Sequence, residues 1–549
     1  MPSNTASVVV SALEAEGVDR IFGVPGEENL AFLEALRSSP IEVVLTRHEQ
    51  HAAFLAANLG RLTGTPGVCF STLGPGATNL ATGLAYAQTG RMPLVAITGQ
   101  KKLRGNDEGE FQQVRVVESM RPLVHRAETI IDGADALHLV RRAFRDASQG
   151  AACLLELPQD VALEPRDAMD VPAPCKPTLG PAPREAVGAA ADLLSSAELP
   201  LLLLGAGANN ARVGQAASSL CAATGLFAIT TQMGKGALSA SDEPHLATIG
   251  VHTKDYVHAA LERADVVMTV GYDVSEHPPE EWNVGRSKAL IHLDRRQARV
   301  HRGYLPSVEL LGDVPATLEA LRRAIKPRTP DAQLAALRGQ IPQWLAAEAE
   351  AEGPAGPGRI VRAVRRGVRA EDVVALDNGL YKIFFARAFP AMGPQRLLLD
   401  NALATMGAGL ATAMAAAQVE PNRFVVAVCG DGGLMMNVQE LETLARTGAS
   451  VCVVVLVDDA FGFIQWEQRD RELGEYSLTF DNPDFVRLAE AFGIHGVAVE
   501  DAAGLEAALR EAKHRGGPSL IRCPIEYPES APFESALHEI AEREIFASK

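Results

Sequence analysis

Short runs of consecutive apolar residues recur along the chain, separated by segments in which apolar residues have helical spacing. Clear examples are Leu201–Leu204, Val266–Val270, Phe424–Cys429 and Val451–Val457. A strand with one face in water usually alternates apolar and polar residues, whereas a parallel strand covered by helices on both faces is apolar throughout. The pattern therefore predicts an α/β fold built from doubly wound parallel sheets.

Proline-rich stretches divide the chain of 549 residues. One stretch lies at 171–183, and a second begins at 326–330 and continues at 352–358. Such composition is typical of linkers, because proline stiffens the backbone and removes a hydrogen-bond donor. We expect three domains, at 1–170, 186–325 and 358–549, and each has the size of an ordinary domain.

The composition argues against several functional classes. Lysine and arginine number 51 against 68 acidic residues, so the formal net charge is −17, and the sequence has no basic stripe of the kind that binds nucleic acid. The apolar runs are far shorter than the roughly 20 residues of a membrane-spanning helix. The N-terminus does not resemble a signal peptide, and the seven cysteines form no CxxC pair. We expect a cytoplasmic protein without nucleic-acid or membrane partners.

A glycine-rich loop with an acidic residue, Gly430-Asp431-Gly432-Gly433, directly follows one expected strand. Leu434, Val438, Leu441 and Leu444 then recur at helical spacing, and Gly448 is expected to end that helix. Glycines let backbone N–H groups approach a phosphate, and a helix N-terminus favours negative charge. An aspartate in such a loop suits phosphate binding only when a cation lies between the two.

A second acidic residue, Asp458, ends the next expected strand, 27 residues after Asp431. One strand–helix–strand step returns the chain to the same edge of a parallel sheet, so the two strand ends are neighbours. Mg²⁺ is commonly held by one or two carboxylates and by substrate phosphates. The pair predicts a metal–diphosphate site, although the loop by itself is also compatible with a structural turn.

Segments 68–100 and 425–459 follow the same plan of strand, glycine-rich turn, helix and strand at nearly the same spacing. This correspondence fits either the general logic of α/β folds or two related domains that face each other. The spacing alone leaves both interpretations open.

Several motifs resemble the thiamine diphosphate-dependent decarboxylase and carboligase family. They are IFGVPG at 21–26, RHEQ at 47–50 and STLGPGATN at 71–79, followed by the GDGG loop and Asp458. The resemblance covers nearly the whole chain and implies pyrimidine-binding, middle and diphosphate-binding domains, in that order. Four stretches of the middle segment are most similar to acetolactate synthases of the catabolic, flavin-independent type. They are 264–273, Glu276, 282–283 and 291–294.

The resemblance implies a role for individual residues. Glu49 would hydrogen-bond N1′ of the cofactor's aminopyrimidine, and Met406 would separate the two cofactor rings. The carbonyl of Ala404 would accept from N4′, while Asp431, Asp458 and the backbone oxygen of Ala460 would hold Mg²⁺. Cofactor contacts are expected from Pro25, Gly26, Glu49, Asn79, Asn378, Gly379, Ala404, Met406, Asp431, Gly432, Gly433, Asp458, Ala460, Phe461, Gly462 and Phe463. Catalytic residues are expected at Glu49 and Gln112, and a substrate pocket at Phe111, Gln112, Phe463, Ile464 and Glu467.

The implied reaction is decarboxylation of pyruvate followed by condensation with a second 2-oxo acid. The implied cofactors are thiamine diphosphate and Mg²⁺, without a requirement for FAD. Because the family joins the pyrimidine and diphosphate domains of different subunits, we expect a homodimer or homotetramer with active sites at the subunit interface. A 2-oxo acid decarboxylase, a hydroxyacyl lyase and a non-catalytic homologue remain the alternatives.

The chain departs from the family pattern at several positions, which leaves the acceptor acid open. Asn401-Ala402 replaces an Asn-Gly pair, and Gly379-Leu380-Tyr381 replaces a Gly-polar-His pattern near the diphosphate. Glu27-Glu28 lies where the catabolic enzymes usually carry a lysine, and Glu467 lies where the anabolic enzymes place a tryptophan. His51, close to Glu49, either packs on its helix or transfers protons.

Overall fold

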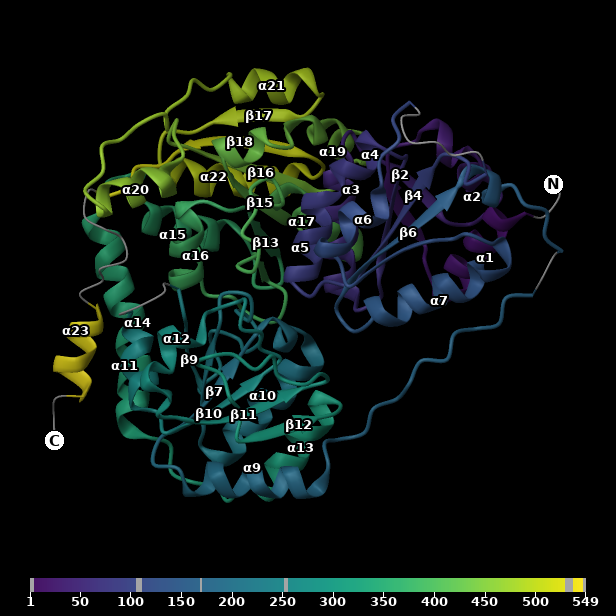
Figure 1. The fold of residues 1–549 in the computed structure, drawn as a ribbon. Helices are drawn as coiled ribbons and strands as arrows, with labels where there is room; N and C mark the ends of the chain where they lie inside the picture. Colours follow the sequence, from purple (N-terminus) through teal and green to yellow (C-terminus); the bar gives the residue numbers. More distant parts are fainter. Residues whose placement is uncertain (1–3, 105–110, 168–169, 251–254, 529–536, 547–549) are drawn as a thin grey trace.

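The computed structural model describes residues 4–104, 111–167, 170–250, 255–528 and 537–546. It contains three six-stranded sheets, and every pairing between their strands is parallel. Helices cover both faces of each sheet (Figure 1). The expected α/β fold of three doubly wound parallel sheets is confirmed. No helix in the described part of the chain is long and apolar enough to cross a membrane.

The first sheet has the strand order β2-β1-β3-β4-β6-β5. Its strands are β1 (Arg20–Gly23), β2 (Glu42–Leu45), β3 (Gly67–Ser71), β4 (Leu94–Gln100), β5 (Arg126–Thr129) and β6 (Ala152–Pro158). The surrounding helices are α1 (Thr5–Glu16), α2 (Leu30–Arg37), α3 (Glu49–Thr63), α4 (Pro75–Asn79), α5 (Ala81–Thr89), α6 (Val116–Met120), α7 (Ala136–Ala147) and α8 (Gln159–Ala162).

The second sheet has the order β12-β11-β10-β7-β8-β9. Its strands are β7 (Pro200–Leu204), β8 (Phe227–Thr230), β9 (His245–Thr248), β10 (Val266–Val270), β11 (Ala289–Asp294) and β12 (Val308–Leu311). Its helices are α9 (Arg184–Ser196), α10 (Ala211–Thr224), α11 (Tyr256–Arg263), α12 (Pro279–Trp282) and α13 (Val314–Ala324). The long helix α14 (Ala332–Ala351) leads on to the third sheet.

The third sheet has the order β14-β13-β15-β16-β18-β17. Its strands are β13 (Val373–Leu376), β14 (Leu397–Leu398), β15 (Val425–Gly430), β16 (Val451–Val457), β17 (His495–Ala498) and β18 (Ser519–Pro524). Its helices are α15 (Pro357–Gly367), α16 (Leu380–Ala388), α17 (Gly409–Val419), α18 (Asp431–Met435), α19 (Leu441–Thr447), α20 (Gly462–Asp470), α21 (Phe485–Ala491) and α22 (Ala502–Arg515).

The first and third sheets share one strand order, counted from their own first strands, and the middle sheet has another. This shared order favours two related domains as the source of the matching segments in the sequence. The two domains also pack directly, helix α3 against helix α17. A long extended segment joins the first domain to the middle one (Figure 1), as the proline content of 171–183 predicts.

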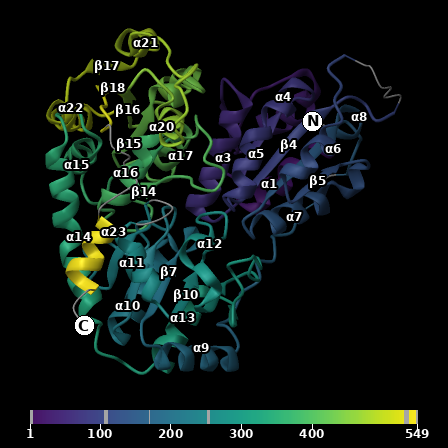
Figure 2. The ribbon, with the colours of Figure 1, turned by 60° about the vertical axis from the view of Figure 1, so that its left-hand side comes forward.

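Two connections differ from the expected pattern. The stretch between the two proline-rich parts of the second linker forms the 20-residue helix α14, which contacts α15 and strand β9. The C-terminal helix α23 (Leu537–Ala541) returns to the middle domain and packs on α11, as both ribbon views show (Figures 1 and 2). An ion pair of 2.5 Å between Arg263 and Glu542 supports that contact.

Candidate functional site

The two acidic strand ends lie side by side. Strands β15 and β16 pair in parallel, with Gly430 opposite Leu456, so the residues that follow them leave the sheet at the same edge. The backbone N–H groups of Asp458 and Asp459 donate to Asp431 Oδ2 at 3.3 and 2.9 Å. The amide of Asn482, a residue that no sequence motif indicates, donates to the same oxygen at 2.7 Å. The expected meeting of Asp431 and Asp458 is therefore present.

The carboxyl groups of Asp431, which is buried, and Asp458, which is half-buried, lie close enough to interact. Burial and the facing carboxylate of Asp431 raise the pKa of Asp458 above its ordinary value. Two acidic groups at one point repel each other unless a proton or a cation is shared between them. Oxygen ligands of this kind suit Mg²⁺, so the residues present fit the metal that the sequence predicts.

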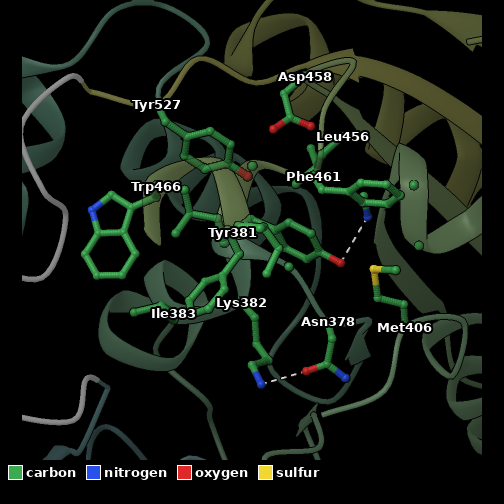
Figure 3. Close-up of a pocket in the computed structure, with 18 of the residues that line it drawn as sticks. Asn378, Tyr381, Lys382, Ile383, Met406, Leu456, Asp458, Phe461, Trp466 and Tyr527 are labelled. Carbon is green, nitrogen blue, oxygen red and sulfur yellow. Dashed lines mark hydrogen bonds between the residues drawn. The ribbon is translucent and has the colours of Figure 1, made fainter. Parts of the chain in front are cut away.

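These acidic residues open into a cavity of about 690 Å³ on the third domain (Figure 3). Asn378, Met406, Phe461 and Asp458 surround it in the close-up. The sequence-predicted residues that line the cavity are Asn378, Gly379, Ala404, Met406, Asp431, Gly432, Gly433, Asp458, Ala460, Phe461, Gly462, Phe463, Ile464 and Glu467. An aromatic wall is added by Tyr381, Trp466 and Tyr527. The volume of the cavity is in the range of sites for small organic ligands.

The glycines of the GDGG loop are required by close packing. A Cβ atom on Gly433 would lie 2.7 Å from Asp377 Oδ2, and one on Gly432 would lie 3.0 Å from the ring of Phe461. The helix expected after the loop ends at Gly448, which has a φ of +64°, as predicted. It is, however, broken between α18 and α19 at Asn437, whose backbone φ of −138° is not helical and whose side chain donates to the Gly407 carbonyl at 3.1 Å.

The backbone of Ala404 has a φ of +54°, a left-handed conformation that residues other than glycine rarely adopt. The carboxylate of Asp400 accepts from the Ala404 N–H at 2.6 Å and from the Ala402 N–H at 3.1 Å. The Asn378 amide donates to the carbonyl of the next residue, Thr405, at 2.6 Å. These bonds hold the segment expected to contact the middle of the cofactor.

Lys382 is a cavity residue that sequence reasoning missed. It is buried, and its ammonium donates to Asn378 Oδ1 at 2.7 Å, to the Asp400 carbonyl at 2.9 Å and to Asn401 Oδ1 at 3.0 Å (Figure 3). Burial lowers its pKa to about 8, although Asp400 and Asp377 oppose the change. Lys382 thus connects helix α16 to the strained segment that contains Ala404.

Tyr381, the residue directly before Lys382, also differs from the family pattern. Tyr381 stands in place of the histidine, is buried, and its hydroxyl accepts from the Gly430 N–H at 3.0 Å. The phenol therefore occupies the base of the glycine-rich loop. The departure from a Gly-polar-His pattern is accommodated by a hydrogen bond to the loop itself.

Glu49 lies at the start of α3 in the first domain and is buried. The Asn79 amide donates to its Oε2 at 2.9 Å, and a Cβ atom on Gly76 would lie 3.0 Å from its Oε1. The RHEQ motif and the glycine-rich turn therefore form one site, as their resemblance implies. Within the described chain, neither Glu49 nor Pro25, Gly26 or Asn79 lines the 690 Å³ cavity.

The remaining expected residues also lie on the first domain. Phe111 is 76% exposed and Gln112 is exposed with a φ of +61°, next to the glycine turn at Gly74 and outside the lining of the cavity. His51 is fully buried, and neither ring nitrogen has a hydrogen-bond partner among the described residues. Burial lowers the pKa of its imidazole, which favours packing over proton transfer.

Comparisons with known proteins agree with this arrangement. Models of the N-terminal, central and C-terminal domains of thiamine pyrophosphate enzymes match residues 3–119, 187–321 and 377–523. The chain is 33% identical to acetolactate synthase of Bacillus subtilis (strain 168), over 96% of this chain and 94% of that protein. It is 32% identical to the catabolic acetolactate synthase of Raoultella terrigena, over 97% of each chain.

A third relative is the large subunit of acetolactate synthase isozyme 2 of Escherichia coli (strain K12), which is 32% identical over 96% of each chain. These similarities extend through all three domains, and the two ligand-binding motifs lie in the domains that the family assigns to thiamine pyrophosphate. The chain belongs to the thiamine pyrophosphate enzyme family, in the group of the acetolactate synthases.

Proposed function

We propose that the protein is a thiamine diphosphate-dependent carboligase, which decarboxylates pyruvate and joins the remaining two-carbon unit to a second 2-oxo acid. The observation that carries this proposal is the meeting of the Asp431 and Asp458 carboxyl groups in the wall of the 690 Å³ cavity. That contact matches a metal–diphosphate site in a chain whose relatives are named acetolactate synthases.

The cavity residues would hold the cofactor at its diphosphate end and at its middle. Asp431, Asp458 and the carbonyl of Ala460 would bind Mg²⁺, and backbone N–H groups of the loop at Gly432 and Gly433 would face the diphosphate. Met406 and the Ala404 carbonyl would contact its middle. Thiamine diphosphate, when bound, supplies the nucleophilic carbon and the electron sink of the reaction.

The first domain would supply the proton control. A carboxyl group at Glu49 would hold a proton at N1′ of the aminopyrimidine, and Asn79 keeps that carboxyl in place. Pro25, Gly26 and Asn79 would surround the same ring. Because Glu49 does not line the cavity of its own chain, we propose that the active site forms between two subunits, so that a homodimer is the smallest active unit.

The substrate would enter against the aromatic side of the cavity. Phe463, Ile464 and Glu467 line it on helix α20 and would meet the acceptor acid, and the partner subunit would contribute Phe111 and Gln112. The apolar wall of Tyr381, Trp466 and Tyr527 would keep water from the reacting atoms. Glu467, which pairs with Arg471 at 2.6 Å, gives this pocket a polar wall where a tryptophan would be apolar, and this difference bears on the choice of acceptor.

We further propose that the reaction needs no flavin. In the glycine turn Gly205-Ala206-Gly207 of the middle domain, the N–H of Ala206 already donates to the carboxylate of Glu276 at 2.8 Å. A Cβ atom on Gly205 would lie 3.0 Å from that same carboxylate. A dinucleotide phosphate at such a turn would need the N–H groups that Glu276 occupies, and the buried acid would repel it.

The proposed setting is the cytoplasm. All seven cysteines are free in the described structure, and six of them are buried, which fits a reducing compartment. The net charge of −17 is consistent with small-molecule substrates and opposes binding to nucleic acid.

The test is to incubate the purified protein with thiamine diphosphate, Mg²⁺ and pyruvate and to follow pyruvate and acetolactate together. The proposal requires two pyruvates to be consumed for each acetolactate and each CO₂ released, with no change on addition of FAD. Acetaldehyde in place of acetolactate would identify a simple decarboxylase. No consumption of pyruvate by cofactor-loaded protein would direct the search to other 2-oxo acids and to acyloins.

A further inference from the structure

A second cavity, of about 710 Å³, lies between the middle and third domains. Strand β9 and helices α11, α14, α15 and α16 contribute to its wall, and several of these elements lie together in Figure 1. It shares no lining residue with the proposed catalytic cavity. The N-terminal half of α16 lines the catalytic cavity and the C-terminal end of α16 lines the second one, so one short helix separates them.

The lining of the second cavity is strongly cationic. Its charged residues are Lys235, Arg338, Arg362, Arg365, Arg366 and Arg387. Among the described residues that line it, none is an aspartate or a glutamate. A cluster of six basic side chains around one cavity creates a positive potential that attracts anions.

Half of these cations have their charge balanced from outside the cavity. Arg387 pairs with Asp255 at 3.1 Å, Arg366 with Glu506 at 2.7 Å, and Arg362 with Glu350 at 3.6 Å. The other half, Lys235, Arg338 and Arg365, form no ion pair with any carboxylate in the described part of the chain. Their hydrogen bonds go to neutral groups instead, chiefly backbone carbonyls.

Lys235 is the most unusual of the three. Its side chain is buried, and its amine donates to the Ala386 carbonyl at 2.8 Å and to Thr248 Oγ1 at 3.3 Å, which leaves a third N–H of the ammonium form without a partner among the described residues. Burial lowers its pKa to about 7. His245 also lines the cavity, is more than nine-tenths buried, and its Nε2 has no partner in the described structure. Buried polar groups of this kind ordinarily have a ligand or counter-ion.

The rest of the wall is apolar and includes Tyr256, Ile341, Leu345 and Phe389. The guanidinium of Arg365 lies over the ring of Phe389, 5.3 Å from its centroid. The site thus combines several donors with a flat apolar surface, and its volume can hold an organic molecule. The two unpaired guanidinium groups of Arg338 and Arg365, together with Lys235 when it is protonated, suit an anion with more than one negative charge. A phosphoryl group offers that charge with oxygens in several directions.

We propose that this second cavity binds a phosphoryl-bearing organic anion, whose phosphate contacts Lys235, Arg338 and Arg365 and whose apolar body packs against Phe389 and Ile341. The site is separate from the proposed reaction and does not depend on it. A nucleotide and free phosphate both carry the phosphoryl group that the cations would bind. Only the nucleotide has an organic body that can contact the apolar wall.

The test is calorimetric titration of the full-length protein, loaded with thiamine diphosphate and Mg²⁺ to fill the catalytic cavity and then freed of unbound cofactor, which would compete as a phosphoryl-bearing anion. The probes are inorganic phosphate and AMP. Saturable binding is expected for both, tighter for AMP by at least about tenfold when the apolar wall contacts the nucleoside. Equal affinity would identify phosphate alone as the recognised group.

Three variants make the result specific. Arg365→Gln and Lys235→Met should each weaken binding by at least about tenfold, the usual effect of losing a hydrogen bond to a charged group. Arg322→Gln, on the exposed face of α13 and outside the cavity, is the matched control and should bind normally. Thermal unfolding of each variant establishes that it is folded. The proposal is overturned when neither probe binds, or when both cavity variants bind as tightly as the control. Since binding is measured without turnover, this outcome is independent of the carboligase assay.

Discussion

The first and third domains have the same strand order but use their acidic residues in opposite ways. In the first, Glu49 has an uncharged partner, the amide of Asn79, at 2.9 Å. In the third, Asp431 faces a second carboxyl group, that of Asp458. A single carboxyl group positioned by an amide is suited to a hydrogen bond with a ligand, whereas two facing carboxylates are suited to a divalent cation. In our proposal one scaffold thus provides a proton site and a metal site from different strand ends, since Glu49 follows the second strand of its domain, whereas Asp431 and Asp458 follow the third and fourth strands of theirs.

The two domains of one chain are also held in contact. The Asn437 amide of the third domain donates to Gln50 Oε1 at 3.1 Å, and the Arg47 N–H of the first donates to Glu440 Oε1 at 3.0 Å. Both contacts involve the RHEQ motif. They fix the first domain against the third without bringing Glu49 into the wall of the same chain's cavity.

The largest expected effect is that of Glu49→Gln. The variant keeps the shape of the side chain and removes its acid–base function, so turnover should fall by about 10²–10⁴-fold while cofactor binding persists. Steady-state assay of acetolactate, together with calorimetric titration of thiamine diphosphate, measures both quantities. Unchanged turnover would contradict a proton role for the first domain.

Asp431→Asn should have the complementary effect. It removes one carboxylate from the proposed metal site, so the apparent affinity for Mg²⁺ should fall by at least about 100-fold, beyond the loss typical of residues that only support a metal ligand. Excess Mg²⁺ should restore part of the activity, which it cannot do for Glu49→Gln. Titration of activity against Mg²⁺ distinguishes the two. An unaltered Mg²⁺ dependence would exclude Asp431 as a ligand.

Co-expression of the two variants tests whether the domains cooperate between subunits. A mixed dimer has one site with both substitutions and one with neither, so purified mixed dimers should recover about half of the wild-type activity. The measurement is the activity of co-expressed, differently tagged subunits purified through both tags and compared with each variant alone. A complete absence of recovery in verified mixed dimers would mean that each site is built within one chain.

The sequence was sufficient to predict the sheets and the acidic pair. Fully buried parallel strands must be apolar, and the rule that adjacent parallel strands end at the same edge brings Asp431 to Asp458. Neither inference needs tertiary detail. The break in the helix after the GDGG loop was not predictable, because it lies at Asn437, whose side-chain partners Gly407 and Gln50 are distant in sequence.

Lys382 shows the same limit at the site itself. A lysine in a helix is normally exposed, and its sequence neighbours give no sign of a buried ammonium. Its partners Asp400 and Asn401 come from a different segment, and only the packing of α16 against that segment brings them together. The separation of Glu49 from the cavity of its own chain likewise depends on how the domains pack.

Lys382→Met has the smallest expected effect on activity. Loss of its charged hydrogen bonds to Asn378 and Asn401 should lower kcat by about tenfold, since such a bond is worth about 1.5–3 kcal/mol.

Burial lowers the pKa of the Lys382 side chain from 10.5 to about 8. Between those values the unfolded chain binds more protons than the folded one, so this residue makes the free energy of unfolding rise with pH across that window. Denaturant unfolding from pH 8 to pH 10 should show a shallower rise for Lys382→Met than for the wild type, whereas Lys326→Met, at an exposed position, should leave it unchanged. If the free energy of unfolding rose with pH at the same slope in both variants, burial would not lower the pKa of Lys382. Its role at the cavity would then be confined to packing.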